Sequence, residues 1–489
     1  MQQKSKLKVL FVSAEVSPYA KTGGLADVAG SLPIALAEKG HDVRIIMPRY
    51  KKIAEQLKYT ADFPVTMDWR KETCIIREHE MNHEKAKVKV YFTDNYQYFD
   101  RDYLYCYFDE AERFAFFAKA VIEMLKFVDF KPDVIHCNDW QSGPVCALLK
   151  EKYESDEFYS KIATVFTVHN LQYQGNYPAD TIKLFGLDEN TYFTPEKLEF
   201  YGTFSFMKAG LNYADIINTV SETYAKEIQT PEYGEKFEGL LNQRTKDLYG
   251  IVNGISYDEF NPETDKKIYK NYDKNSLQNK KINKAELQKE MGLPKSEAPL
   301  VGFISRLTNQ KGLDLIVEKM EEILKNDIQF VLLGSGDEYY ETLFKNYAKK
   351  YPKNVAVFIG FNAVLAQKIY AGSDMFLMPS MFEPCGLGQI FSLRYGTIPI
   401  VRATGGLADT VIDCEQNKEG NGFSFKDYSS KELLKTINRA VNFYKKKPEE
   451  WHQLLIRAME QDFSWNRSAD KYIEIYNKAI LKKTKEQKR

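Results

Sequence analysis

The sequence predicts an α/β protein built from two doubly wound, Rossmann-like domains that face a central cleft. Short apolar runs alternate with helical patterns through the first half of the chain, and the alternation starts again in the second half. Runs that are apolar throughout are typical of parallel strands covered by helices on both faces. The hexapeptide Thr-Gly-Gly-Leu-Ala-Asp also occurs twice, at 22–27 and at 404–409. A chain of 489 residues exceeds what one hydrophobic core usually holds.

The first domain is expected to hold a parallel sheet whose strands are joined by helices. Amphipathic patterns at 25–39 and 110–127 predict two of these helices. The strands are expected at 8–12, 43–47, 88–92, 134–137, 164–168 and 216–220.

The second domain begins after Pro262 and a polar stretch at 265–284. We place the boundary near residues 253–262, which gives domains of residues 1–255 and 256–464, and the remaining segment, 465–489, is a helix with a charged tail. The strands of the second domain are expected at 300–304, 330–333, 355–359, 375–378 and 398–401, and its helices at 313–325, 339–350, 363–371 and 387–395.

Composition and missing motifs exclude several classes of protein. Lys plus Arg and Asp plus Glu both total 68, so no net charge points to a nucleic-acid partner. The first strand leads into neither GxGxxG nor a P-loop, which disfavours a nicotinamide dehydrogenase and a P-loop NTPase. No signal peptide and no apolar run of about 20 residues is present, so we expect no membrane association. The six cysteines form no paired framework, which predicts reduced thiols in a cytoplasmic protein.

Both copies of the hexapeptide follow a strand and precede a predicted helix. A Gly pair lets bare N–H groups approach a ligand, and the positive end of the helix dipole favours an anion such as phosphate. Lys21 directly precedes the first copy, next to Gly23 and Gly24, and adds a positive charge. The alternative is an ordinary strand–turn–helix connection, but the repetition favours two domains that share one charged ligand.

Three charged residues follow strands of the second domain. Arg306 and Lys311 come after the strand at 300–304, where two cations would neutralise a diphosphate without a metal. Glu383 follows the strand at 375–378 and precedes a helix, where its carboxylate would accept hydrogen bonds from sugar hydroxyls. A structural ion pair and a simple helix cap are the alternatives.

Two histidine-containing segments follow strands of the first domain, at 136–141 and 167–171. A His and an Asp in one segment suggest a metal or acid–base site. The chain has only six His and no carboxylate triad, so we predict no metal site. The Asp-x-Asp at 100–102 follows an aromatic run, and we interpret it as a surface turn.

Seven motifs, in this order, closely resemble those of bacterial glycogen synthases and plant starch synthases. The resemblance covers about residues 8–465 and implies a two-domain GT-B fold. It also implies transfer of glucose from ADP-glucose to the non-reducing end of an α-1,4-glucan, glycogen or a maltooligosaccharide, with retention and no metal cofactor. The motifs are KTGGLADV, HCNDW, FTVHNLQYQG, IVNGI, SRLTNQKG, PSMFEPCGLGQ and TGGLADT.

The same resemblance assigns roles to individual residues. The first domain would bind the acceptor and part of the donor, the second the nucleotide sugar, and the C-terminal helix would cross back onto the first domain. The mechanism implied is attack by the acceptor 4-hydroxyl on the face that ADP leaves, with Arg306, Lys311 and helix N–H groups stabilising the diphosphate. The catalytic set implied is Glu383, Arg306, Lys311 and His169, and the donor-binding set is Lys21, Gly23, Gly24, Asp139, Asn253, Cys385, Gly386 and Leu387.

The chain departs from the family pattern at two places, and at a third it differs from a broader class of related enzymes. Asn138 stands where a His is familiar, Ile255-Ser256 stands where an acidic residue is common, and Phe391 replaces the second Glu of related retaining enzymes. The last difference favours glycogen and starch synthases over sucrose- or lipid-directed relatives. The alternatives are a glycogen phosphorylase, another nucleotide-sugar transferase and a non-catalytic homologue. Sequence leaves open ADP- or UDP-glucose, acceptor length, oligomeric state, regulation, and whether Glu383 is a stabiliser or a transient nucleophile.

Overall fold

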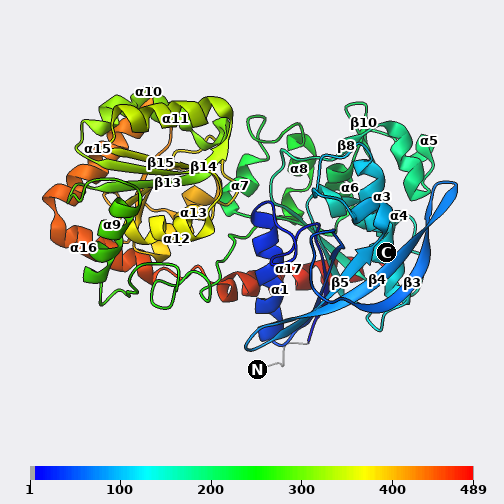
Figure 1. Cartoon of the computed structure of the whole chain (residues 1–489). Helices are drawn as coiled ribbons and strands as arrows, with labels where there is room; N and C mark the ends of the chain where they lie inside the picture. Colours follow the sequence, from blue (N-terminus) through cyan, green and yellow to red (C-terminus); the bar gives the residue numbers. More distant parts are fainter. Residues whose placement is uncertain (1–5, 488–489) are drawn as a thin grey trace. The chain divides into compact units, whose positions relative to one another are not determined.

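The computed structural model describes residues 6–487 and divides into two compact units. Unit 1 comprises the described chain up to Gly254 together with the segment that begins at Trp465. Unit 2 comprises Ile255–Ser464. Each unit is an α/β sandwich around its own sheet (Figure 1).

Unit 1 contains a nine-stranded sheet in the order β12-β11-β7-β6-β1-β2-β5-β4-β3. Neighbours from β12 to β5 are parallel, so the carboxyl ends of these strands meet at one edge. The strands are β1 (Lys8–Val12), β2 (Asp42–Pro48), β3 (Lys58–Met67), β4 (Arg70–Asn82), β5 (Lys87–Asp94), β6 (Val134–Asn138), β7 (Ala163–Val168), β11 (Ile216–Thr219) and β12 (Leu248–Gly250), and a separate small sheet holds β8 (Asn176–Tyr177), β9 (Glu199–Phe200) and β10 (Thr203–Ser205).

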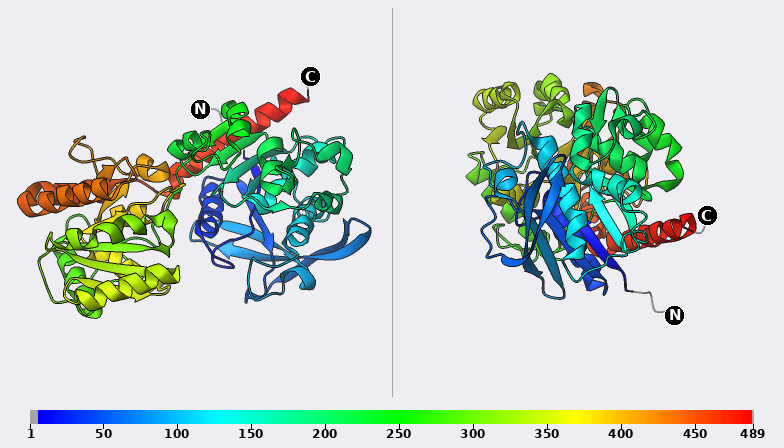
Figure 2. Two further views of the ribbon diagram at one scale, coloured as in Figure 1. Left: turned by 90° about the horizontal axis from the view of Figure 1, so that it is seen from above. Right: turned by 90° about the vertical axis from the view of Figure 1, so that its right-hand side faces the viewer.

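The antiparallel pair β3–β4 was not expected from the sequence. It forms the long ribbon at one edge of the unit 1 sheet, blue in Figure 2. Buried residues alternate with exposed ones at the end of β3, and the buried residues of β4 are separated by partly or fully exposed ones, so neither strand contains the continuous apolar run that marks the parallel strands.

Helices cover both faces of the unit 1 sheet. The last helix, α17 (Trp465–Glu486), packs against α1 (Gly24–Glu38) and under the sheet, where the Tyr476 hydroxyl lies 2.8 Å from Nδ1 of His136. This contact ties the end of the chain to the centre of unit 1. The other helices are α2 (Tyr96–Phe99), α3 (Glu110–Glu123), α4 (Gly143–Glu151), α5 (Glu189–Tyr192), α6 (Phe206–Tyr213), α7 (Glu222–Glu227) and α8 (Glu238–Gln243).

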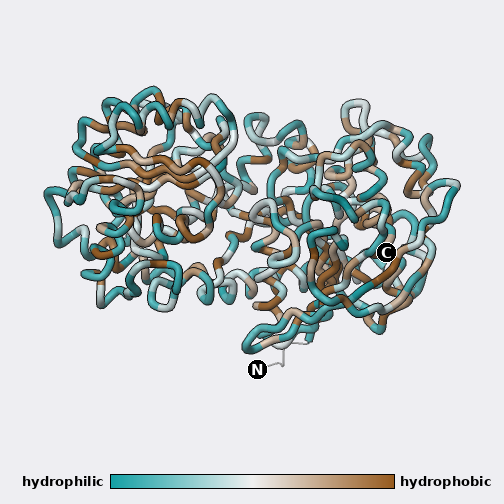
Figure 3. Tube along the Cα trace, viewed as in Figure 1, coloured by the Kyte–Doolittle hydropathy of each residue, from teal (hydrophilic) through white to brown (hydrophobic). Residues whose placement is uncertain are grey.

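Unit 2 contains a six-stranded parallel sheet in the order β15-β14-β13-β16-β17-β18. Its strands are the apolar centre of the unit and its helices carry the polar surface (Figure 3). The strands are β13 (Leu300–Leu307), β14 (Gln329–Gly336), β15 (Val355–Ile359), β16 (Met375–Met378), β17 (Ile398–Arg402) and β18 (Phe423–Phe425); the helices are α9 (Gln278–Glu290), α10 (Leu313–Leu324), α11 (Glu338–Lys350), α12 (Ala363–Gly372), α13 (Gly388–Arg394), α14 (Gly405–Thr410), α15 (Ser430–Lys446) and α16 (Pro448–Glu460).

Helix α9 lies partly in the polar stretch that separates the two apolar patterns. Its buried face packs against α12 and combines Leu287 with polar residues, among them two lysines that bury their ammonium groups against acceptors. Lys280 Nζ donates to the carbonyl of Ala371 (2.9 Å) and to Oγ1 of Thr397 (2.7 Å), and burial lowers its pKa to about 7. Lys284 Nζ lies 2.7 Å from the carboxylate of Asp374. Because the buried face of α9 includes lysines whose ammonium groups are paired, its sequence lacks the apolar stripe that usually indicates a packed helix.

No helix within residues 6–487 combines the length and the apolar character that crossing a bilayer requires.

Candidate active site

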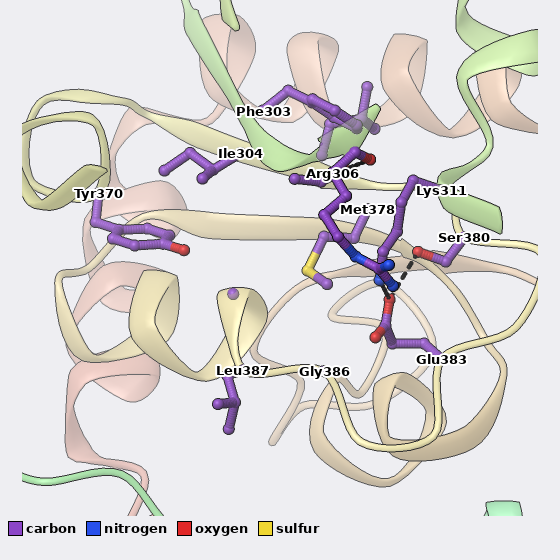
Figure 4. Close-up of a pocket in the computed structure, with 13 residues that line it drawn as sticks. Phe303, Ile304, Arg306, Lys311, Tyr370, Met378, Ser380, Glu383, Gly386 and Leu387 are labelled. Atoms are coloured by element: carbon purple, nitrogen blue, oxygen red, sulfur yellow. Dashed lines mark hydrogen bonds and ion pairs between the residues drawn. The ribbon is translucent and has the colours of Figure 1, made fainter. Parts of the chain in front are cut away.

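A cavity of about 200 Å³ opens at the carboxyl edge of the unit 2 sheet, between the ends of β13 and β16 (Figure 4). This edge is where doubly wound sheets bind ligands. The residues that line it are Phe303, Ile304, Ser305, Arg306, Lys311, Tyr370, Leu377, Met378, Ser380, Glu383, Gly386, Leu387 and Gly388.

Lys311 and Glu383 form an ion pair in this cavity. Nζ of Lys311 lies 2.6 Å from Oε2 of Glu383, and the hydroxyl of Ser380 donates to the same oxygen at 3.0 Å. Both charged side chains are largely buried, so their attraction is only weakly screened. Sequence reasoning missed Ser380, whose only signal is its place three residues before Glu383.

Arg306 is exposed beside this pair, and Figure 4 shows Arg306 and Lys311 both extending toward Glu383. The Arg306 guanidinium lies 3.5 Å from Oε1 of Gln310, whose amide nitrogen donates to the carbonyl of Phe382 (3.2 Å). Gln310 also accepts from the backbone N–H of Met381 (2.8 Å). These bonds join the loop that carries Arg306 and Lys311 to the loop that carries Glu383. They fix the positions of the two loops relative to each other.

The second hexapeptide copy, whose Gly405 begins α14, packs against the backbone of Glu383. The N–H of Gly406 donates to the carbonyls of Glu383 and Pro384, each at 3.1 Å. Gly405 has φ of +47°, and a Cβ there would lie 2.0 Å from the carbonyl oxygen of Glu383. The glycines of this copy therefore permit close backbone packing that supports the Glu383 loop.

Cys385 and Gly386 complete the turn from Glu383 into α13. Cys385 is buried, and a Cβ on Gly406 would lie 2.0 Å from its carbonyl oxygen. Gly386 has φ of +69°, a conformation that favours glycine. Leu387 is the residue that precedes α13 and lines the cavity. The structure thus brings the donor-binding residues predicted in the second domain together with Arg306, Lys311 and Glu383.

The first hexapeptide copy leads into α1 at the carboxyl edge of the unit 1 sheet. Lys21 is half exposed, and its Nζ lies 2.5 Å from the carboxylate of Asp27. A Cβ on Gly23 would meet nothing within 4 Å, so the space beside this loop is open. The N–H groups of Thr22 and Gly23 donate to the carboxylate of Glu15, a residue that sequence reasoning did not select.

Asp139 and His169 lie together at the same edge of unit 1. Asp139 has φ of +54° and accepts a 2.7 Å hydrogen bond from the backbone N–H of His169. Burial, reinforced by the negative charge of Glu15, raises the pKa of Asp139 to about 7. A non-glycine residue held in this conformation stores strain, as functional residues often do.

Asn138 orients the His169 ring, although the sequence suggested no role for it. Its Oδ1 lies 3.0 Å from Nε2 of His169, and its amide nitrogen donates to the carbonyl of Val12. Burial lowers the pKa of His169 to about 3, so the ring is neutral at pH 7 and its Nε2–H donates to Asn138. A neutral imidazole serves as a hydrogen-bonding group, because the imidazolium form that acts as a general acid is not populated at pH 7.

The side chain of Asn253 is buried, and its Oδ1 has no hydrogen-bond partner among residues 6–487. A buried amide oxygen without a donor favours a ligand that supplies one. The preceding carbonyl, of Val252, accepts a 2.8 Å bond from the hydroxyl of Ser468 in α17.

The Asp-x-Asp at 100–102 is a surface feature, as expected. The two carboxylates pair with different cations, Asp100 with Arg49 (3.3 Å) and Asp102 with Lys51 (2.9 Å). Within residues 6–487 no group of three or more His, Cys, Asp or Glu side chains is arranged to hold a metal ion.

The chain matches two family models. One describes the starch synthase catalytic domain and matches residues 8–243; the other describes glycosyl transferases group 1 and matches residues 284–454. Glycogen synthase of Desulforudis audaxviator is 56% identical over 491 residues, covering 98% of each chain. Glycogen synthase of Thermotoga maritima is 48% identical over 485 residues, covering 97% of this chain and 99% of the relative.

Solved structures give the same family. The catalytic domain of starch synthase IV from Arabidopsis thaliana, bound to ADP and acarbose, superposes with a TM-score of 0.90 at 35% identity, over 98% of this chain and 100% of that one. Sucrose-phosphate synthase from Thermosynechococcus elongatus, at 18% identity and a TM-score of 0.58, shares the fold. The prediction of two Rossmann-like domains of the GT-B class is confirmed, and the chain belongs to the glycogen and starch synthase family of glucosyltransferases.

Proposed function

We propose that the enzyme transfers glucose from ADP-glucose to the non-reducing 4-hydroxyl of an α-1,4-glucan, with retention and without a metal ion. The observation that carries this proposal is the cavity in which Arg306 and Lys311 converge on Glu383. The solved starch synthase IV domain is bound to ADP and acarbose, which supports a site for a nucleotide sugar and a glucan.

Arg306 and Lys311 stabilise the leaving diphosphate. As the bond between the anomeric carbon and the phosphate oxygen breaks, negative charge grows on the diphosphate and positive charge on the glucosyl ring. Two fixed cations in a partly enclosed site stabilise the first charge without reorganising. The carboxylate of Glu383, 2.6 Å from Nζ of Lys311, stabilises the second. No divalent ion is then needed.

The acceptor attacks on the face that the diphosphate leaves. Its 4-hydroxyl oxygen forms the new bond to the anomeric carbon while the bond to phosphate breaks, and its proton passes to the departing phosphate oxygen. This route keeps the α configuration and requires no separate base. The neutral His169 and the carboxyl group of Asp139 are suited to hydrogen-bond the glucosyl hydroxyls, and Lys21 and Asn253 supply further polar contacts to the donor.

Phe361 is the residue we propose for the nucleotide base. It follows β15, the edge strand next to β14, at the carboxyl edge of the unit 2 sheet. The residue is 88% exposed. An exposed ring at the ligand edge offers a stacking surface that a purine covers more fully than a pyrimidine. This stacking supports ADP-glucose over UDP-glucose.

The six cysteines are all free thiols, which supports a reducing compartment, and we place the enzyme in the cytoplasm.

One assay tests the proposed function. Incorporation of labelled glucose into glycogen is measured with ADP-glucose and with UDP-glucose, each with and without EDTA. We expect faster incorporation from ADP-glucose, no loss in EDTA, and a product that an α-1,4-specific amylase digests completely. Activity that disappears in EDTA and returns with magnesium contradicts metal-free transfer, and a β-linked product contradicts the reaction itself.

Single-turnover experiments with Glu383→Gln separate the two roles of the carboxylate. A stabilising role predicts a lower rate with unchanged ADP affinity and no trapped intermediate. A glucosyl ester isolated on Glu383 of the native enzyme replaces front-face attack with double displacement.

A further inference from the structure

Glu15 is a buried carboxylate in the loop after β1, and only 4% of the residue is exposed. Its Oε2 accepts hydrogen bonds from the N–H groups of Thr22 and Gly23, the latter at 3.3 Å. Its Oε1 accepts from the hydroxyls of Thr22 (2.6 Å) and Tyr105 (2.8 Å). Four donors therefore converge on one carboxylate that has no Lys or Arg partner among residues 6–487.

The backbone of Glu15 is fixed as firmly as its side chain. The hydroxyl of Ser13 donates to the carbonyl of Glu15 at 2.6 Å and accepts from its N–H at 3.3 Å. A buried carboxylate is costly unless donors satisfy it, and this one is satisfied on both oxygens. The four donors therefore form an anion-binding site, and the anion that occupies it is the carboxylate of Glu15.

The N–H groups that Glu15 occupies are those of the first hexapeptide copy. In the structure they already have an acceptor, so this part of the loop is shaped before any ligand arrives. Lys21 stands directly before the bonded N–H groups, and Gly24 begins α1 directly after them. Because Glu15 holds Thr22 and Gly23 in place, it also fixes the direction in which the Lys21 side chain extends from the loop.

Tyr105 extends the same support to a second loop of unit 1. The segment that carries it is held by Arg113, which is fully buried and donates to the carbonyls of Tyr98 (2.7 Å) and Leu104 (3.1 Å). Glu15 thus joins the loop after β1 to the segment after β5, and both lie at the carboxyl edge of the same sheet.

We propose that Glu15 is a positioning residue for donor binding: its carboxylate occupies the N–H groups of Thr22 and Gly23 and thereby fixes the loop that presents Lys21. This inference rests on the proposed role of Lys21 at the donor. The donor diphosphate takes the charge of Lys21, and the N–H groups of Thr22 and Gly23 remain with Glu15 throughout the reaction.

Two substitutions of Glu15 separate positioning from charge. In Glu15→Ala the N–H groups lose their acceptor, and we expect the KM for ADP-glucose to rise about tenfold with a smaller change in kcat. In Glu15→Gln the amide oxygen accepts from the two N–H groups, and the hydroxyls of Thr22 and Tyr105 turn to accept from the amide nitrogen. A Gln variant within about threefold of the wild-type KM supports positioning; a Gln variant as impaired as Ala overturns it, because the negative charge itself is then required.

Formate provides a direct test of the internal anion. A small carboxylate fits the space that Glu15→Ala leaves, so formate is expected to lower the KM of this variant toward the wild-type value. Chloride at the same ionic strength is the control, and the wild-type enzyme, whose site is filled, is expected to show no such response. Absence of rescue by formate, with chloride and formate equivalent, overturns the proposal.

Hydrogen–deuterium exchange distinguishes failure of this inference from failure of the proposed function. Exchange at Thr22 and Gly23 is expected to be at least about tenfold faster in Glu15→Ala than in the wild type, and unchanged in the matched control Tyr105→Phe. Unchanged exchange in Glu15→Ala shows that the carboxylate does not hold the loop. Faster exchange with an unaltered donor KM shows that the loop is held but that Lys21 does not bind the donor.

Discussion

The same hexapeptide serves different purposes in the two units. In unit 1, Gly23 has an extended backbone and open space around it, and the N–H groups of Thr22 and Gly23 hold a carboxylate from the same loop. In unit 2, Gly405 and Gly406 are pressed against the carbonyls of Glu383 and Cys385. The first copy presents Lys21 to solvent, whereas the second supports the loop that carries Glu383.

The charges around the two copies differ in the same way. Glu383 in unit 2 has a cation, Lys311, at 2.6 Å. Glu15 and Asp139 in unit 1 have hydrogen-bond donors instead and, among residues 6–487, no Lys or Arg partner. An identical sequence therefore does not determine an identical role, because the neighbours that tertiary structure supplies decide what its N–H groups and glycines contact.

The largest expected effect concerns the cations of unit 2. Lys311→Ala or Arg306→Ala should lower kcat by about 10² to 10³, as loss of one preorganised stabilising group does in other enzymes. Arg306→Lys should also fail, because a point charge does not reproduce a planar fork. Steady-state kinetics with ADP-glucose measure this, and an unchanged kcat with reduced thermal stability alone would show that the residues are structural.

Gly405→Ala should have the next largest effect. The new Cβ overlaps the carbonyl oxygen of Glu383, and φ of +47° is strained for alanine. Displacing the Glu383 loop by a fraction of an ångström should lower kcat by about 10- to 100-fold. Thermal unfolding of the same variant should show a lower midpoint, and a variant with normal kcat would remove the supporting role of the second copy.

The raised pKa of Asp139 predicts that the stability of unit 1 depends on pH. Its pKa is raised from 3.8 to about 7 in the folded protein, so the stability contributed by its protonated form is complete below about pH 4 and is lost as pH rises to 7. Asp139→Asn keeps an acceptor for the N–H of His169 and cannot ionise. At pH 8 it should be more stable than the wild type by on the order of 2 kcal/mol, since a shift of one pKa unit corresponds to about 1.4 kcal/mol and the group is only partly buried.

Thermal or urea unfolding of both proteins at pH 5 and pH 8 measures this difference. The advantage of the Asn variant should shrink toward pH 5, where Asp139 is protonated in the folded state. Parallel pH profiles for the two proteins would contradict the raised pKa of Asp139.

Lys21→Ala tests whether Lys21, which the first copy presents to solvent, binds the donor. The side chain is half exposed and pairs with Asp27, which is itself partly exposed, so its removal should leave the fold intact. We expect the KM for ADP-glucose to rise about tenfold with a smaller loss in kcat, since one charged contact of about 1.4 kcal/mol is removed. A KM equal to that of the wild type would show that Lys21 does not contact the donor.

The smallest expected effect is that of Gly23→Ala, the counterpart of Gly405→Ala. The backbone of Gly23 suits any residue, and a Cβ meets nothing within 4 Å. The free energy of unfolding should stay within about 1 kcal/mol of the wild-type value, because the loss of chain entropy in the unfolded state favours alanine. Equal damage from Gly23→Ala and Gly405→Ala would mean that the two copies serve the same purpose.

Much of the parallel framework was predictable because buried parallel strands need continuous apolar runs. The expected strand at 8–12 coincides with β1, and the one at 375–378 with β16. The ribbon β3–β4 was missed because its buried residues are interrupted by more exposed ones, and helix α9 was missed because its buried face contains lysines whose partners lie elsewhere in the chain. Local patterns do not reveal such distant partners.

By itself, the sequence determined the doubly wound class, the family and the identity of the charged residues after β13 and β16, because each depends on a local run of residues. Tertiary structure alone decided that Lys311 meets Glu383, that Asn138 orients a neutral His169 and that Glu15 occupies the first glycine loop. The first two contacts join residues that are distant in sequence, and the third joins residues of one loop. Burial in the folded chain sets the pKa values of Asp139 and His169. The physical reason is that hydrogen bonding and desolvation act between neighbours in space, which only the folded chain brings together.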